Sequence, residues 1–161
     1  MRGLNYPSPS GSFLDWKILA PDGEVEDYKV RLFAGSPYAC DPGLYQSSVN
    51  SYRKLNPATA SYDVIGNLGS ETSIGYNVLD NIIYGVRKTG TSEGQIIAIA
   101  SDGSYASLGF ATRMDTGAPL TLSNAQLAID GENNIWMGNW RINLNTMTAT
   151  PVVFSGAAMT T

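Results

Sequence analysis

The 161-residue sequence predicts an all-β fold built from repeated four-stranded antiparallel units. Its apolar runs are short, rich in β-branched and aromatic residues, and separated by turn residues, which is typical of an antiparallel meander. With 17 glycines and 8 prolines, the chain has the residues that many turns require. No eleven-residue window shows a helical apolar period. Internal repetition is the third observation, and it sets the size of the unit.

Two internal matches define the repetition. Residues 74–85 (IGYNVLDNIIYG) align without a gap with residues 127–138 (LAIDGENNIWMG), 53 positions later. Residues 55–65 (LNPATASYDVI) align with residues 144–154 (LNTMTATPVVF), 89 positions later. We expect 74–85 and 127–138 to form equivalent β-hairpins with the same strand register.

The chain divides into four segments in order. Residues 1–12 are a flexible Pro/Ser/Gly lead. Residues 13–35 form an N-terminal hairpin, with strands at 13–20 and 25–34 around the turn Pro21-Asp22-Gly23. Residues 36–156 form the repeat domain, and 157–161 are a tail.

The repeat domain is expected to contain short strands in three copies. The segment Leu44-Tyr45-Gln46 is a weak copy of Ile83-Tyr84-Gly85. The predicted strands are 52–55, 62–65, 73–76, 82–86, 95–100, 105–108, 126–129, 135–137, 141–144 and 152–154. The expected buried aliphatic residues are Ile83, Ile97, Ile99, Ile135 and Leu144, because alternation places them on one sheet face.

The three copies span about 36–69 (incomplete), 70–109 and 121–156. Four-stranded units of this length are the size of propeller blades, so the domain is predicted to be a partial, β-propeller-like array of about three blades. Closed propellers need at least four blades. Three blades leave edges and faces uncovered, which predicts self-association unless the N-terminal hairpin covers them.

Residues 55–109 also resemble a known group of sequences. The segments LNPATA, IGNLG, IGYNVLDNIIYGV and GQIIAIASDGSY resemble an uncharacterised family of propeller-like repeats in secreted and cell-surface proteins of bacteria and fungi. The resemblance covers roughly 40–109, with weaker similarity to residue 154. It implies an extracellular or cell-surface, non-catalytic domain, and it carries over no catalytic residues.

Composition excludes several classes of function. A net charge of −4 and the absence of histidine argue against nucleic-acid binding. No apolar run has the length of a membrane span, and the start MRGLNYPSPSGS lacks the apolar segment of a signal peptide. The single cysteine, Cys40, cannot form an internal disulfide and is expected to be a free thiol. Without histidine, and without a phosphate loop or zinc-ligand spacing, we expect no enzyme and no cofactor.

Aromatic residues near strand ends give the candidate ligand site. Sugars are bound by flat aromatic faces beside polar side chains. Trp140, between Asn139 and Arg141 in a turn, is expected to be exposed. The candidate ligand-binding residues are Trp140, Tyr105, Asn139 and Arg87. Tyr84 and Trp136 are expected instead to fill the space between sheets.

The segment 130–134 concentrates oxygen ligands. Asp130, Glu132 and Asn134 form a weak candidate calcium site, because calcium prefers oxygen-rich loops. The EF-hand order is absent, and a plain Asx turn is the favoured interpretation, so no metal is expected. Carboxylate neighbours such as Asp130 with Glu132 seldom face each other across a substrate.

These observations favour a non-enzymatic binding or assembly module that acts through loops and sheet edges, with itself, a protein or a glycan as partner. The alternatives are a lectin-like carbohydrate-binding domain and a hydrolase or lyase on a propeller scaffold.

Overall fold

The computed structural model describes residues 18–19, 25–26, 35–38, 43–69, 72–88, 93–122 and 126–153. The chain divides into two units, Met1–Ala34 and Gly35–Thr161. In the first unit, β1 (Ile18–Leu19) pairs antiparallel with β2 (Val25–Glu26). The described residues form strands and turns and no helix, which confirms the all-β prediction. The predicted lead 1–12, the tail 157–161 and Cys40 lie outside the described residues.

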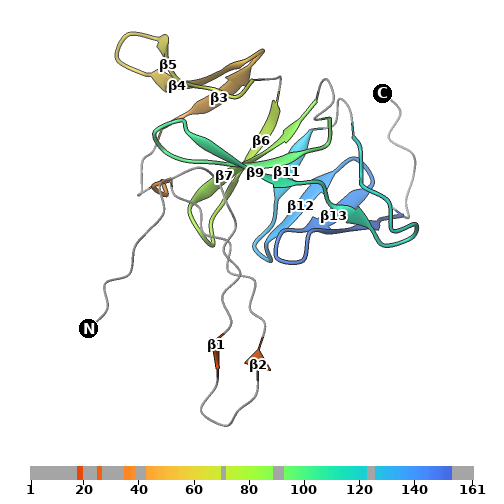
Figure 1. The fold of residues 1–161 in the computed structure, drawn as a ribbon. Helices are drawn as coiled ribbons and strands as arrows, with labels where there is room; N and C mark the ends of the chain where they lie inside the picture. Colours follow the sequence, from red (N-terminus) through yellow and green to blue (C-terminus); the bar gives the residue numbers. More distant parts are fainter. Residues whose placement is uncertain are drawn as a thin grey trace. The chain divides into compact units, whose positions relative to one another are not determined.

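The second unit contains three sheets (Figure 1). Sheet I comprises β3 (Tyr45–Ser48), β4 (Ser51–Asn56) and β5 (Ser61–Asn67). Sheet II comprises β6 (Thr72–Asn77), β7 (Ile82–Arg87), β8 (Ile96–Ile99) and β9 (Tyr105–Gly109). Sheet III comprises β11 (Leu127–Ile129), β12 (Asn134–Met137), β13 (Trp140–Asn143), β14 (Thr148–Pro151) and β10 (Thr112–Arg113). All pairings are antiparallel except that of β10 with β14, at the edge of sheet III.

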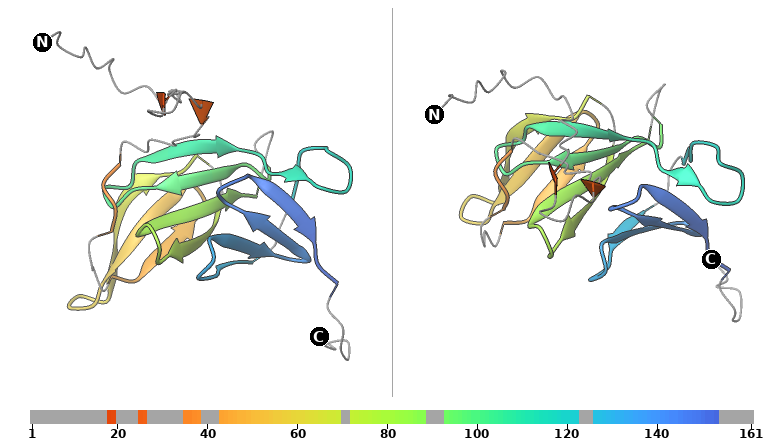
Figure 2. Two further views of the ribbon diagram at one scale, coloured as in Figure 1. Left: turned by 90° about the horizontal axis from the view of Figure 1, so that it is seen from below. Right: turned by 60° about the horizontal axis from the view of Figure 1, so that its bottom comes forward.

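Sheet II lies between the other two sheets (Figure 2). One of its faces carries Ile83, Ile97 and Ile99, which pack with Tyr52 of sheet I. Its other face carries Val86 and Ile96, which belong to the core shared with sheet III. Strands β7 and β8 therefore have apolar residues on both faces, as expected for strands covered on both sides. All five residues predicted to be buried are buried: Ile83, Ile97, Ile99, Ile135 and Leu144.

The first internal match is a pair of hairpins, but their registers differ. Asn77 pairs with Ile82 across four turn residues, whereas Asp130 N–H donates to the carbonyl oxygen of Asn134, 3.0 Å away, across three. The gap-free alignment is therefore wrong by one residue on the return strand. Both turns end on an asparagine in the left-handed region, with φ of 59° at residue 81 and 66° at residue 133. Asparagine tolerates this conformation, so either loop length closes the hairpin.

The corrected register makes Tyr84 the counterpart of Trp136. Each aromatic side chain donates a hydrogen bond to an aspartate of its own turn. Tyr84 Oη–H donates to Asp80 Oδ2 at 2.6 Å, and Trp136 Nε1–H donates to Asp130 Oδ2 at 2.7 Å. The repeated element is a hairpin whose turn carboxylate is fixed by the first aromatic residue of the return strand.

In the second internal match, the two segments correspond at one offset in their first turn and at a different offset in the next. At 89 positions apart, the β3–β4 hairpin corresponds to the β12–β13 hairpin, because both have two-residue turns that begin with a left-handed residue, Val49 or Gly138. The next turns, 56–61 and 143–148, lie only 87 positions apart. Strand β4 is longer, and its pairing with β5 shifts register between Tyr52 and Arg53.

This difference explains a wrong strand prediction. The last strand is Thr148–Pro151, and Val152 and Val153 follow it rather than begin it. Met147, at φ 54°, is the last residue of the turn, so the next strand begins at Thr148. The apolar residues 152–154 had predicted a later start. Strands β3–β5 thus correspond to β12–β14, and the described residues of sheet I include no counterpart of β6 or β11.

Candidate functional site

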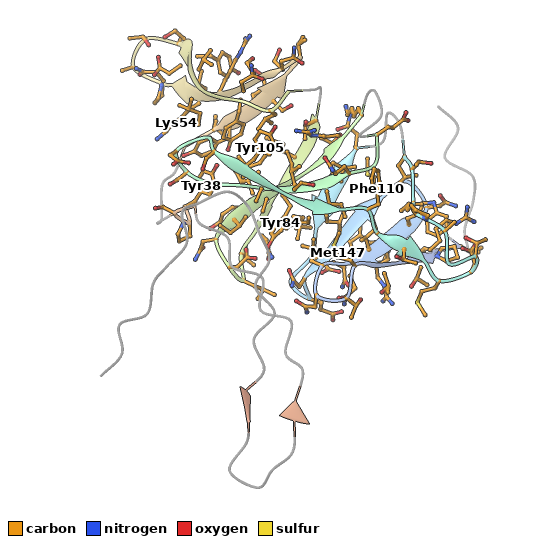
Figure 3. The ribbon with its side chains drawn as sticks, in the orientation of Figure 1. Tyr38, Lys54, Tyr84, Tyr105, Phe110 and Met147 are labelled. Carbon is orange, nitrogen blue, oxygen red and sulfur yellow. The ribbon has the colours of Figure 1, made fainter. Side chains whose placement is uncertain are left out.

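The structure brings together two of the four predicted ligand residues. Arg87 and Tyr105 leave sheet II on the face toward sheet I, and Figure 3 labels Tyr105. Arg87 Nη2 donates to Tyr105 Oη at 2.7 Å and to the carbonyl oxygen of Leu68 at 3.0 Å. The guanidinium also lies 5.0 Å from the centroid of the tyrosine ring. This pair ties two strands of sheet II to the end of sheet I, so both side chains have a structural role.

The other two residues lie elsewhere. Trp140 is only 9% exposed, so the expectation that it is exposed is wrong. It pairs with Met137 across a two-residue turn, which puts its ring on the core face of sheet III, where the Arg113 guanidinium lies 4.9 Å from the ring centroid. Asn139 is exposed in that turn, and its carbonyl oxygen accepts from Val152 N–H at 2.7 Å. The four residues therefore do not form one site.

The segment 130–134 is a hydrogen-bonded turn. The Asp130 carboxylate accepts from Trp136 Nε1–H, from the backbone N–H groups of Glu132 and Asn134, and from the Asn134 side-chain amide. Partial desolvation opposes ionisation, but these hydrogen bonds together outweigh it and lower the pKa of Asp130 to about 2. Both carboxylate oxygens accept hydrogen bonds from protein donors. Within the described residues, no three His, Cys, Asp or Glu side chains gather in a cluster that could hold a metal ion.

A buried tyrosine cluster joins sheets I and II. Tyr38, labelled in Figure 3, donates its hydroxyl proton to the carbonyl oxygen of Ala100 at 2.7 Å. Tyr52 Oη–H therefore donates to Tyr38 Oη at 2.8 Å. The Tyr45 ring stacks on Tyr52 with centroids 5.7 Å apart. Burial raises the pKa of Tyr38 to about 12 and raises that of Tyr52 further above its ordinary value.

Sheet I has one open face, which the sequence analysis missed. Cross-strand partners share a face, so the row Gln46, Arg53 and Val64 lies on the opposite side from buried Tyr52. We call this surface the head face. Its members are Leu44, Gln46, Arg53, Leu55, Tyr62 and Val64. Leu44, Tyr62 and Val64 are exposed large apolar residues, an arrangement that marks interaction surfaces.

Sheet III has an open face at the other end of the stack. The row Ile129, Ile135, Ile142 and Ala149 faces sheet II, and the row on the opposite side is open. We call this surface the tail face. Its members are Ala128, Trp136, Arg141 and Thr150, with Asp130 beside them. Ala128 and Arg141 are exposed, and Trp136 is half-buried.

Comparison with known proteins adds no assignment. No protein-family model matches the chain, and no curated protein matches it. The described part of the chain contains no helix long and apolar enough to cross a membrane.

The head face could have been recognised from strand alternation. In the sequence Ser61-Tyr62-Asp63-Val64, every second residue is apolar, which identifies a two-sided strand. The missing information was the side on which sheet II lies. That depends on the pairing register of β4 with β5, and this register contains an irregularity.

Proposed function

We propose that the chain is a non-enzymatic binding and assembly module of β-propeller type that works outside the cell through its open sheet faces. The observation that carries the proposal is the apolar head face. Leu44, Tyr62 and Val64 project from the side of sheet I that faces away from its neighbour. Apolar side chains in such a row are stabilised by a covering partner.

The other functional classes have less support. The carboxylates at 130 and 132 belong to one turn, and Asp130 is held by hydrogen bonds, so they do not make a pair across a substrate. Lectin-like binding retains one observation in its favour, the exposed Tyr105 ring with Arg87 over its face. A ring and a guanidinium together suit an acidic sugar.

Solution mass tests the assembly proposal. We expect light scattering at high micromolar concentration to give a mass above that of one chain, and we expect Val64→Arg to reduce it to one chain. Val78→Arg is the matched control, because Val78 is 63% exposed and Val64 is 65% exposed, but Val78 lies in the β6–β7 turn. A wild-type monomer that is retained on a column of acidic glycan would reject assembly in favour of the lectin function.

A further inference from the structure

The contact between sheets II and III shows how one sheet of the chain packs against the next. Gly75 of β6 lies under the side chains of Leu127 and Ile129 of β11, and a Cβ atom at Gly75 would collide with Leu127. Tyr84 lies on the same face and packs at the edge of that core. This face of sheet II combines a very small residue on its first strand with an aromatic residue on its second.

The tail face has the same construction. In the corrected register, Ala128 takes the place of Gly75, and Trp136 takes the place of Tyr84. Within the described part of the chain, no sheet packs over Ala128, which is exposed. The tail face therefore resembles the face of sheet II that packs against sheet III, but among the described residues no sheet packs against it.

The head face resembles the other partner in that contact, which is the face of sheet III that packs on sheet II. Counted from the β3–β4 turn, Arg53 takes the place of Ile142, and counted from the β4–β5 turn, Leu55 does, so both lie on the face that corresponds to that of Ile142. Leu144 and Ile142 are buried in the core through which sheet III packs on sheet II. Leu55 and its exposed neighbours occupy the corresponding face of sheet I, which has no preceding sheet among the described residues.

Charge also favours this combination. Arg53 is the charged residue of the head face, whereas the tail face has the Asp130 carboxylate beside it as well as Arg141, and the exposed Glu132 belongs to the same turn as Asp130. Asp130 remains ionised at neutral pH. Attraction between faces of opposite sign favours a head-to-tail contact and disfavours a contact between two heads.

We propose that the partner is a second copy of this chain, with the head face of one copy packed on the tail face of the next. The proposal rests on the assembly function and specifies its geometry. Such a contact is heterologous, so repetition gives a closed ring or an open filament. Two joined copies would continue the order of stacking that sheets I, II and III follow within one chain.

Complementation between variants tests this geometry. Val64→Arg blocks the head face, and Ala128→Arg blocks the tail face. We expect each variant alone to be monomeric and an equimolar mixture to contain 1:1 heterodimers, because one unblocked head meets one unblocked tail. The mass should double on mixing. A third variant with both substitutions should remain monomeric in every mixture, and Val78→Arg should assemble like the wild type.

Other outcomes overturn the proposal in distinguishable ways. If Ala128→Arg assembles and Val64→Arg does not, two heads pair, so the geometry is wrong and the assembly function stands. If both variants are monomeric and their mixture is too, head-to-tail contact is rejected. If the wild type is monomeric, both proposals fail. Tyr62→Arg and Thr150→Arg provide a second pair of variants, and circular dichroism checks that each variant is folded.

Discussion

Sheets I and II are antiparallel meanders of three and four strands, and they place their apolar residues differently. In β8 of sheet II all four residues are buried, because sheets cover both faces. In β5 of sheet I the first four residues are exposed, and the apolar ones, Tyr62 and Val64, point away from sheet II. A strand at the end of a stack normally puts its polar residues outside. The alternation in β5 is the reverse of this pattern, and it is the observation on which the proposed assembly rests.

Truncating one aliphatic residue in each sheet gives the largest expected difference. Ile99→Ala in sheet II should cost about 2–5 kcal/mol of unfolding free energy, since the side chain is fully buried between two sheets. Val64→Ala in dilute protein should change it by less than about 0.5 kcal/mol, as for surface sites. Urea denaturation at low protein concentration measures both. A cost below about 1 kcal/mol for Ile99→Ala would show that its face is not buried.

A second prediction extends the comparison to sheet III. Asp130→Ala removes the acceptor of Trp136 Nε1–H and of two backbone N–H groups, and should cost about 2 kcal/mol. The folded-state pKa of about 2 lies below the unfolded value of 3.8, so the contribution is full above pH 4 and is lost as the pH falls toward 2.

Chemical denaturation across this pH range measures the effect. The variant should lose less stability between pH 4 and 2 than the wild type. Asp63→Ala, at an exposed position of sheet I, is the control. Parallel acid profiles for the wild type and Asp130→Ala would contradict the account.

The tyrosine cluster tests how sheet I is attached to sheet II. Tyr38→Phe removes one of the two donors to the Ala100 carbonyl oxygen, which keeps Gly103 N–H, and leaves the buried Tyr52 hydroxyl without its acceptor, so it should cost about 1–3 kcal/mol. Tyr52→Phe keeps the bond from Tyr38 to Ala100 and should cost about 1 kcal/mol or less. Thermal melts show which of the two variants loses more stability. Equal losses would argue against the assigned direction of the hydrogen bonds.

The same cluster predicts alkaline sensitivity. The pKa of Tyr38 is raised from 10 to about 12, so its contribution to stability is full below pH 10 and is lost as the pH rises through 12. Tyrosine absorbance at 295 nm during alkaline titration should show ionisation of the cluster together with unfolding. Ionisation of all nine tyrosines near pH 10 with the fold intact would contradict the burial of the cluster.

The smallest expected effect compares two turns. Val49 and Gly138 begin equivalent two-residue turns with φ of 47° and 59°, a conformation that strains a β-branched residue. Val49→Gly should stabilise the chain by about 0.5–1 kcal/mol, and Gly138→Val should destabilise it by at least as much. Thermal melts measure both changes, and a destabilising Val49→Gly would show that the turn is not left-handed there.

The fold was predictable as far as strands and their three-part grouping. The apolar runs of β7 and β8 and the repeated turns identified sheet II and its buried residues. The registers were not predictable, because the turns after Asn77 and Asp130 differ by one residue and close with the same left-handed asparagine. The strand 148–151 was missed because Thr-Ala-Thr-Pro has no apolar run.

The candidate site was predicted less well for a related reason. Trp140 follows a turn, and this position led us to expect exposure. The two-residue turn pairs it with Met137, however, so both side chains lie on the buried face of sheet III. Arg87 and Tyr105 were chosen as polar and aromatic residues of loops, and their contact depends on pairing across two strands. Which face of a strand is covered is a property of register, and register is weakly encoded in strands this short.

Hydroxyl-radical footprinting of two tyrosines tests the central claim most directly. Tyr62 on the head face and Tyr76 of β6 are 47% and 43% exposed in the single chain, so they should be labelled similarly at low protein concentration. We predict that Tyr62 becomes protected as the concentration rises, while labelling of Tyr76 stays constant. A ratio of the two that does not change with concentration would contradict assembly through the head face.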